Sequence, residues 1–419
     1  MSPAFDVVVL GGGPAGSVCA TRLAQRGVRV LLLEKEHFPR FRLGESLLPR
    51  SLPMLAEIGV LDTLEAEFLR KYGARFHDDV HGKKERFSFA GAFRADVDHA
   101  FQVSRDAFDH VLLRHAKTSG VDVREGTTAR ITFDGDIPVV DATCEGKTFR
   151  VTPHFVVDAT GRDAQLAHAS RSTQKIAGLE RTAFFAHYEG VPREAGRGEG
   201  DIDIILLEPG ASGEPQWLWI IPFKGYVSSV GAVVSRSWIR EQKTSGGDPT
   251  ALLRAALAAS PTASAMLANA TMTWPEARAA ADFSYRVDRL VGPRWTAIGD
   301  AGGFVDPLFS TGVHLAIVGA KTVADVLVDE LSSHDMTARY AWERSMKEAT
   351  DTFVLAVQAF YGGGLANYLF ADDKHVAIRR SVTSLLAGDV FHDAIWLRDA
   401  RRRLTELRDG TGSEENRPS

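Results

Sequence analysis

Several groups of residues in this chain have types and spacing that could serve chemistry, and the first is a glycine-rich loop near the N-terminus. Gly11, Gly13 and Gly16 stand between an apolar run at residues 6–10 and a helical pattern that continues to Arg26. Gly11 allows a tight turn, Gly13 lets the backbone approach a pyrophosphate, and Gly16 permits close packing of a helix on a strand. The helix start offers free amide donors and a positive dipole to phosphate groups.

A glutamate completes this candidate phosphate site. Glu34 follows a second apolar run, residues 28–33, and stands 23 positions after Gly11. Its carboxylate can accept hydrogen bonds from the ribose hydroxyls of an adenosine. The order of strand, glycine turn, helix, strand and acid therefore predicts a dinucleotide-binding fold rather than an isolated glycine-rich turn.

A second group lies at residues 306–313, where a Ser-Thr-Gly turn opens a long apolar pattern that runs to Leu331. Backbone amides at Thr311 and Gly312 would be free at the start of a helix. These donors and the helix dipole together form an anion site.

Two tryptophans and a lysine complete the candidates. Trp217 and Trp219 are two positions apart on a predicted strand, so they point to the same face, and Pro222 ends that strand because it cannot donate to the ladder. They could be no more than core anchors of a sheet.

Lys71 is adjacent to Arg70, and the pattern alone does not choose between these two cations. A buried lysine ammonium could hydrogen-bond and activate an electrophile, with its pKa changed by burial.

Two later strand ends narrow the dinucleotide to FAD. Residues 155–162 and 295–301 are buried-strand patterns that end in small-residue turns. Both resemble the glutathione-reductase-like flavoproteins. In that resemblance Asp300 binds the ribityl chain, Gly161 lies near the cofactor, and Arg105 contacts the cofactor from a later helix. The alternative for Asp300 is a turn or cap aspartate.

The elements that must position these groups form an α/β chain with two further parts. Residues 1–165 and 276–332 are predicted to form a discontinuous FAD-binding Rossmann domain, with a strand excursion near residues 76–101. Residues 166–275 are predicted to form an antiparallel roof sheet over the flavin. Strand-like alternation is expected at residues 87–101 and 182–234. Residues 333–408 are predicted to form a helical layer and residues 409–419 a disordered tail. Glycines 362–364 indicate a helix break, and the aromatic residues Phe353, Phe360, Tyr361, Tyr368 and Phe370 are either pocket lining or core.

Composition excludes several classes of protein. The chain has 419 residues and a net charge of −5, which argues against nucleic-acid binding. Cys19 and Cys144 are its only cysteines, so a disulfide framework or zinc site is not expected and a reducing cytoplasm suits the count. The first ten residues read as a strand rather than a signal peptide. Three charges interrupt the apolar stretch at residues 312–331, which indicates an amphipathic helix rather than a membrane span.

The motifs taken together resemble those of the flavin-dependent halogenases from Phe5 to about Leu397. Residues 217–222 fit the pattern W-x-W-x-I-P, and residues 44–49 precede Lys71 as in the halogenases and geranylgeranyl-reductase-like flavoproteins. The resemblance selects Lys71 over Arg70. It also implies halide at the amides of Thr311 and Gly312, although stabilisation of the flavin alone remains the alternative. The cofactor-contacting positions that it implies are Gly11, Gly13, Ala15, Gly16, Glu34, Lys35, Arg42, Ser46, Arg105, Asp158, Gly161, Gly299, Asp300, Pro307, Gly312 and Val313.

The resemblance implies a two-component reaction. A separate flavin reductase supplies FADH2, which reacts with O2 to give a flavin hydroperoxide. Chloride or bromide attacks its distal oxygen, and the hypohalous acid reaches Lys71, which delivers halogen to an electron-rich carbon. A closed roof keeps this reagent from water. No metal, nucleic acid or membrane takes part.

One departure concerns the substrate. Free-tryptophan halogenases carry a glutamate near the Ser-Thr-Gly turn, but Pro307, Leu308 and Phe309 stand here. The chain therefore resembles the halogenases of phenols and pyrroles, many of which act on substrates tethered to carrier proteins. Asp282 is either a carboxylate near the flavin or a structural acid. The alternatives for the whole chain are an FAD-dependent aromatic monooxygenase, a geranylgeranyl-reductase-like reductase or dehydrogenase, and a flavin-binding protein without activity.

Overall fold

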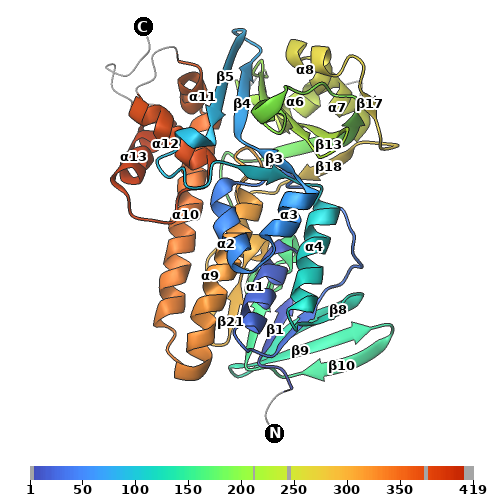
Figure 1. Ribbon diagram of the computed structural model, residues 1–419, viewed down its shortest axis with the longest axis vertical. Coiled ribbons are helices and arrows are strands. Elements are labelled where there is room, and N and C mark those ends of the chain that lie inside the picture. The colour runs from blue at the N-terminus through green and yellow to red at the C-terminus, as the bar shows by residue number, and fades with distance from the viewer. Residues whose placement is uncertain (1–3, 211–212, 243–246, 372–375, 410–419) are drawn as a thin grey trace.

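The structure is a computed structural model that describes residues 4–210, 213–242, 247–371 and 376–409 (Figure 1). The start of the chain and most of its two longest helices lie in the lower half of the view, and a large sheet lies in the upper half. The last three helices lie beside this upper sheet, at the upper left. The predicted domain boundaries at residues 165, 275, 332 and 408 stay predictions.

The lower half contains a six-stranded sheet in the order β20-β21-β11-β1-β2-β7. Strands β1, β2, β7, β11 and β21 pair in parallel, and β20 pairs antiparallel with β21. Strands β1 and β2 are buried along their whole length, as strands of a parallel sheet covered on both faces are. This arrangement confirms the predicted α/β class. The elements are β1 (Val7–Leu10), α1 (Pro14–Gln25), β2 (Val30–Leu33), β7 (Asp122–Arg124), β11 (Phe155–Asp158), β20 (Val291–Gly292) and β21 (Trp295–Ala297).

Alternate residues of β1 face two different layers. Val7 and Val9 pack into the main core with α1 and the long helix α9 (Thr311–Ser333), whereas Val8 and Leu10 pack against a second, three-stranded sheet. This antiparallel sheet has the order β10-β9-β8 and was not foreseen from the sequence. Its strands are half-exposed and polar, so their alternation is weak. They are β8 (Thr127–Asp134), β9 (Ile137–Cys144) and β10 (Lys147–Val151).

The upper half is an eight-stranded, mostly antiparallel sheet, here called the roof sheet, with the order β17-β13-β16-β15-β14-β4-β5 and with β18 paired to β13. One face carries Trp217 and Trp219 toward the main core, and the other carries Leu218 and Ile220 toward three short helices. The elements are β4 (Gly73–Asp78), β5 (Lys83–Ser88), β13 (Arg181–Glu189), β14 (Ile202–Leu207), β15 (Gln216–Pro222), β16 (Val227–Ser235), β17 (Thr271–Met272), β18 (Arg278–Ala281), α6 (Arg236–Glu241), α7 (Pro249–Ala258) and α8 (Pro261–Met266).

The expected strand alternation at residues 87–101 is wrong over most of that range. β5 ends at Ser88, a short 3-10 helix η2 (Phe89–Gly91) follows, and β6 (Ala100–Gln102) starts only at Ala100. Phe89 belongs to this turn and is fully buried. A buried turn residue therefore gave this segment a strand-like apolar pattern. The remaining elements before α9 are η1 (Pro49–Ser51), α2 (Leu52–Glu57), α3 (Leu61–Glu67), β3 (Leu69–Lys71), α4 (Arg105–Thr118), η3 (Gly161–Asp163), α5 (Gln165–Ala169), β12 (Thr173–Lys175), η4 (Gly196–Gly198), β19 (Tyr285–Val287), η5 (Gly299–Gly302) and β22 (Gly303–Phe304).

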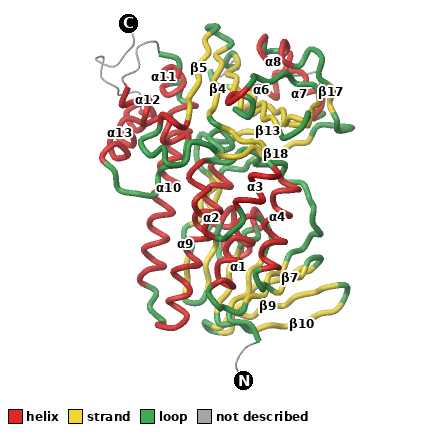
Figure 2. Tube along the Cα trace, viewed as in Figure 1, coloured by secondary structure: helices red, strands yellow, loops and turns green. Residues whose placement is uncertain are grey.

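The C-terminal part contains helices and no strand among its described residues, as predicted. Helices α9 and α10 run side by side (Figure 2). Helix α9 is long and apolar enough to cross a membrane, but 72% of its most apolar stretch is buried within the protein, as in a core helix. The helix breaks at the glycines after Tyr361, and Gly363 has φ +83°. Asp409 ends a helix, which corrects the predicted tail at that residue; residues 410–419 lie outside the described chain. The helices are α10 (Thr337–Tyr361), α11 (Gly364–Leu369), α12 (Val376–Leu386) and α13 (Ile395–Asp409).

Candidate functional site

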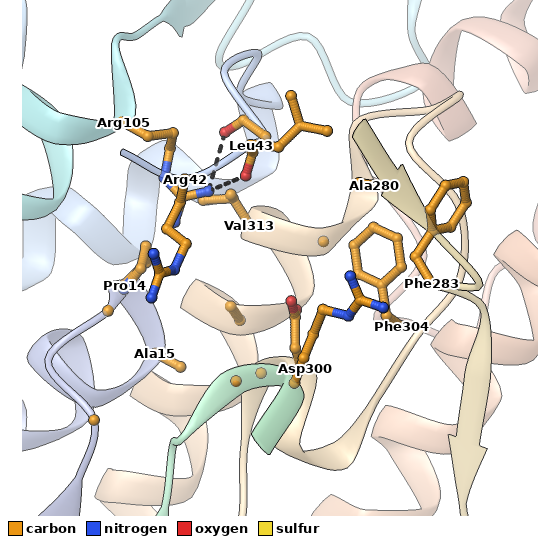
Figure 3. Close-up of a pocket in the computed structure, with 18 of the residues that line it drawn as sticks. Pro14, Ala15, Arg42, Leu43, Arg105, Ala280, Phe283, Asp300, Phe304 and Val313 are labelled. Atoms are coloured by element: carbon orange, nitrogen blue, oxygen red, sulfur yellow. Dashed lines mark hydrogen bonds between the residues drawn. The ribbon is translucent and has the colours of Figure 1, made fainter. Parts of the chain in front are cut away.

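A cavity of about 750 Å³ runs from the N-terminus of α1 to the inner face of the roof sheet. Its lining includes the glycine loop, the segment at residues 40–46, the strand ends near residues 159–163 and 298–300, the turn before α9 and residues of the roof sheet. Figure 3 shows Pro14, Arg42 and Arg105 on one side of it and Ala280, Phe283 and Phe304 on the other. The cavity therefore lies at the carboxyl ends of the parallel strands, the usual position for a dinucleotide.

The glycine loop leaves no room for side chains at two of its three predicted positions. A Cβ at Gly11 would lie 2.2 Å from the carbonyl oxygen of Ala159, and one at Gly16 would lie 1.9 Å from that of Gly11. Gly11 also has φ +104°, in the region that favours glycine. At Gly13 the nearest atom to a Cβ is 3.5 Å away, so this position is open toward the cavity.

This difference gives a first prediction, for Gly13→Ala. The backbone of Gly13 is extended, with φ −68°, and tolerates alanine, so we expect the variant to fold with a nearly unchanged melting temperature. FAD should nevertheless bind about tenfold or more weakly, because the methyl group occupies the close approach that a pyrophosphate needs. Fluorescence titration with FAD measures the affinity, and thermal unfolding measures the fold. An unchanged dissociation constant would exclude pyrophosphate at Gly13.

Glu34 is buried at the end of β2 and lines the cavity. Its Oε2 accepts a hydrogen bond of 2.6 Å from the amide of Gly12, and its Oε1 accepts one of 2.8 Å from the amide of Glu36. Each carboxylate oxygen keeps a further lone pair. Glu34 therefore fixes the glycine loop and remains able to accept a ribose hydroxyl.

The segment at residues 40–46 is held by Arg105 at the start of α4. The guanidinium of Arg105 donates to both carboxylate oxygens of Asp109, at 2.7 and 2.9 Å, and to the carbonyl oxygen of Leu43 (Figure 3). Arg40 donates to the same carboxylate at 2.6 Å. Asp109 is fully buried, and such paired, hydrogen-bonded charges fix one geometry of the segment.

The two predicted aspartates have different surroundings. Asp300 lines the cavity, and burial raises the pKa of its carboxyl although Arg105 and Arg162 oppose that change. Asp158 does not line the cavity. Its carboxylate instead accepts hydrogen bonds from the amides of Thr160 and Leu166 and from the Thr160 hydroxyl, which fixes the turn after β11.

The turn before α9 ends at a cavity-lining residue, Thr311, whose hydroxyl is unsatisfied. Ser310 has φ +56° and α9 starts at Thr311. The Oγ1 atom of Thr311 is buried and has no hydrogen-bond partner among the described residues. Thr311 and Gly312 both line the cavity at a helix N-terminus, where a buried polar group is normally paired. The site can accept an anion from the cavity side.

Trp217 and Trp219 form part of the cavity wall on β15, with ring centroids 5.9 Å apart. The indole of Trp219 donates to the hydroxyl of Ser229 at 3.1 Å. Pro222 ends β15, as predicted, and does not line the cavity.

Lys71 is buried at 2% exposure and lies directly behind the cavity wall. Its Nζ donates to the hydroxyl of Ser46, a cavity residue, at 2.9 Å and to the carbonyl oxygen of Leu47 at 3.3 Å. The same nitrogen lies 5.2 Å from the ring centroid of Phe89. Burial lowers the pKa of Lys71 to about 7, and Asp201 only partly opposes this change. The amine is therefore largely neutral in weakly basic solution.

The burial of Lys71 gives a stability prediction. Because its pKa falls from 10.5 to about 7, the folded protein binds this proton more weakly than the unfolded chain does. The destabilisation is complete below about pH 7 and declines as the pH rises toward 10.5. We expect Lys71→Met to raise the free energy of unfolding by roughly 1–4 kcal/mol at pH 6 and by less at pH 10.

Urea unfolding at both pH values measures this effect. The exposed Lys117 of α4 provides the control, because Lys117→Met should change stability little and equally at both pH values. A loss of stability in Lys71→Met at pH 6 would contradict the prediction.

The structure brings most of the predicted positions together. Four do not line the cavity: Gly16, which packs α1 on β1, together with Asp158, Lys71 and Pro222. The aromatic residues of α10 and α11 do not line it either, and Phe353 and Phe360 are fully buried in the core. Sequence reasoning missed Arg40, Phe41, Glu45, Arg162, Arg278, Phe283 and Phe304, which line the cavity.

Glu45 had a detectable signal, since it stands inside the quoted motif at residues 44–49. Its Oε1 pairs with His187 at 2.8 Å, and its buried Oε2 has no partner among the described residues. Arg278 had no such signal. It is exposed on β18, and its guanidinium lies 4.5 Å from the ring centroid of Phe41 and 4.4 Å from that of Trp274.

Asp282 lies on the surface beside this region. It has φ +48°, and its carboxylate pairs with Arg236 at 2.6 Å and with Lys175 at 3.5 Å. The hydrogen bond from Arg236 holds the pKa of Asp282 below its usual range.

Comparison with known proteins adds the family context. Residues 6–94 and 80–364 match the family described as Tryptophan halogenase. The chain is 32% identical over 365 residues to the tryptophan 2-halogenase of Chondromyces crocatus, a match that covers 85% of this chain and 67% of that protein. It is 29% identical to a 1H-pyrrole-2-carbonyl-peptidyl-carrier-protein chlorinase of Pseudomonas fluorescens, with 92% and 90% covered. The corresponding brominase of Pseudoalteromonas luteoviolacea is 31% identical, with 81% of each chain covered.

Solved structures of flavoproteins are also similar to this chain. A flavoprotein/dehydrogenase from Cytophaga hutchinsonii superposes with a TM-score of 0.89 at 28% identity, covering 98% of this chain and 100% of that one. The flavin-dependent brominase Bmp2 superposes with a TM-score of 0.85 at 26% identity, covering 97% and 99%.

Proposed function

The chain belongs to the tryptophan-halogenase family, the flavin-dependent halogenases, and we propose that Lys71, Thr311 and Gly312 carry its halogenation step. It is an FAD-dependent oxidoreductase that halogenates an aromatic substrate with FADH2, O2 and halide. The observation that carries the proposal is the buried amine of Lys71, one hydrogen bond behind the cavity through Ser46.

The residues present fit FAD. Gly11 and Gly16 leave no space for a Cβ, and the open side of Gly13 faces the cavity at the start of α1. Glu34 at one end and the Thr311 turn near the roof sheet give the cavity polar groups at both ends. Reduced FAD in this site supplies, with O2, the two-electron oxidation that converts halide into hypohalous acid. The positions proposed to contact FAD are the cofactor positions predicted from the sequence that line the cavity, which are all of them except Gly16 and Asp158.

Thr311 and Gly312 hold the halide in this proposal. The free amides at the start of α9 and the helix dipole attract an anion, and the unpaired Oγ1 of Thr311 can donate one more hydrogen bond. The apolar wall formed by Trp217, Trp219 and Ile221 keeps water from the oxidised halogen.

Lys71 receives the halogen. When its amine is neutral, two N–H bonds serve Ser46 Oγ and Leu47 O, and the nitrogen lone pair stays available to an electrophilic halogen. Burial brings the pKa of Lys71 to about 7, which makes this form common at the pH of a cell. Lys71 thereby positions or captures the halogen for the substrate's electron-rich carbon.

The substrate in this proposal is a phenol or a pyrrole. No carboxylate is available at Pro307, Leu308 or Phe309, and the carboxyl of Asp306 is occupied by the amide of Leu308 and the hydroxyl of Tyr361. A ring that reacts without help from a base suits such a site. Two relatives act on pyrrole bound to a peptidyl carrier protein, which supports a carrier-tethered substrate here. A flavin reductase is the expected second component, and the cytoplasm the expected location.

Turnover in the presence of FADH2, O2 and bromide or chloride tests the proposal. Free and carrier-tethered pyrroles and phenols are offered side by side, and products are identified by mass. We expect a halogen-shifted mass that depends on halide. Hydroxylated product formed at the same rate with and without halide would overturn the proposal in favour of an aromatic monooxygenase.

A further inference from the structure

Three buried polar side chains from distant parts of the chain form a continuous hydrogen-bonded series. The indole Nε1–H of Trp217 donates to the hydroxyl oxygen of Tyr361 at 3.0 Å, and that hydroxyl donates to Oδ2 of Asp306 at 3.2 Å. The other carboxyl oxygen of Asp306 accepts from the amide of Leu308 at 2.9 Å. The three side chains belong to β15, to the C-terminal end of α10 and to the turn before α9.

This series lies in the protein interior, where the burial of polar groups costs free energy. Trp217 is 1% exposed, Asp306 is fully buried, and burial raises the pKa of the Asp306 carboxyl to about 7. The guanidinium of Arg181 lies 4.3 Å from the ring centroid of Tyr361. Apolar side chains of the same shape would fill the site at lower cost, so the hydroxyl and carboxyl serve to fix positions rather than to add stability.

One end of the series lines the cavity, and the other end lies in the turn that leads to it, whereas the centre of the series lies outside the lining. Trp217 is part of the cavity wall, and Asp306 begins the turn that leads to the anion site at Thr311. Tyr361 does not line the cavity. Any effect of its hydroxyl on the reaction must therefore pass through Trp217 and Asp306.

We propose that Tyr361 is a positioning residue, whose hydroxyl sets the indole of Trp217 and the turn at residues 306–311 at a fixed separation beside the cavity. The inference rests on the proposed function, because the proposed halogen transfer is what requires this fixed separation. The wall and the anion site must stay in register so that oxidised halogen reaches Lys71 rather than escaping. Tyr361 sets the efficiency of halogen transfer, and cofactor binding does not depend on it.

Tyr361→Phe tests this inference, since it removes only the hydroxyl. We expect halogenated product per FADH2 oxidised to fall about tenfold, the size expected when a buried hydrogen-bond partner is lost. The KM for halide should rise, and the dissociation constant for FAD should stay within about twofold. Tyr368→Phe is the matched control, because the Tyr368 hydroxyl has no partner among the described residues and its loss should change none of these values.

A flavin-free measurement separates this inference from the proposed function. Protein labelled with 5-fluorotryptophan gives a ¹⁹F resonance for Trp217, assigned by its loss in Trp217→Phe. We expect Tyr361→Phe and Asp306→Asn to shift or broaden this resonance, and Tyr368→Phe to leave it unchanged. An unchanged Trp217 resonance in Tyr361→Phe would overturn the positioning role, whereas wild-type protein without halogenated product would overturn the proposed function instead.

A double-mutant cycle completes the test. If Tyr361 acts through Trp217, the losses of product yield in Trp217→Phe and Tyr361→Phe will not multiply in the double variant. Fully independent losses would contradict the inference. Should Tyr361→Phe fail to fold, Asp306→Asn enters the same cycle, because it keeps the shape of the carboxyl and weakens the same series.

Discussion

Lys71→Ala is expected to abolish halogenated product while FAD remains bound. The side chain lies outside the cavity lining, so its removal leaves the contacts of the glycine loop and of Glu34 intact. It takes away a buried amine that donates a hydrogen bond to the cavity residue Ser46. The rate of product formation should fall at least about 100-fold, as for removal of a residue that reacts directly with substrate or reagent.

The neighbouring cation provides the control. Arg70 is the outward-facing residue of β3, and its Nε pairs with Glu65 at 2.6 Å on the surface. Arg70→Ala should retain halogenation within about threefold, since exposed ion pairs contribute little. Product analysis by mass and FAD titration of both variants distinguish the two positions. Wild-type product yield in Lys71→Ala would remove Lys71 from the mechanism.

The same residue predicts the pH dependence of the reaction. Only the neutral amine has a lone pair for an electrophilic halogen, and the pKa of Lys71 lies at about 7. The rate at saturating substrate should therefore rise as the pH increases through 7 and then level. A rate that falls over this range would indicate that the protonated lysine is the active form.

The second large effect is expected for Gly11→Ala. A Cβ there lies 2.2 Å from the carbonyl oxygen of Ala159; the backbone fixes the Cβ and the carbonyl is part of the main chain, so neither can move aside. The positive φ of +104° adds strain for any residue with a side chain. We expect a loss of stability of about 3 kcal/mol or more and no measurable FAD binding.

Gly27→Ala separates the effect of the steric clash from that of the backbone strain. Gly27 also has positive φ, +83°, but a Cβ there meets nothing within 4 Å. It should cost only about 1–2 kcal/mol, the strain of the backbone alone, and bind FAD normally. Thermal unfolding and flavin titration measure both variants. Gly11→Ala that binds FAD like the wild type would show that the loop is not the cofactor cradle.

The sequence by itself determined the features whose causes lie within a few residues. The glycine loop and Glu34 are specified by turn, helix start and strand end, all close along the chain. The start of α9 at Thr311, the end of β15 at Pro222 and the helix break after Tyr361 follow equally local rules. These local rules predicted the α/β class, and with the motifs at Lys71 and residues 217–222 they carried the resemblance to the flavin-dependent halogenases that implied FAD and halogenation.

Only the tertiary structure decided how those pieces meet. Lys71 is buried because β3 pairs with β6 and Phe89 covers it, and no nearby residue encodes that burial. Asp306 and Tyr361 are 55 positions apart, and Trp217 is farther still, so their series exists only once the roof sheet, α9 and α10 have packed. Local preferences act between neighbours in sequence, whereas pKa values, cavity walls and buried hydrogen bonds depend on which distant segments exclude water from a side chain.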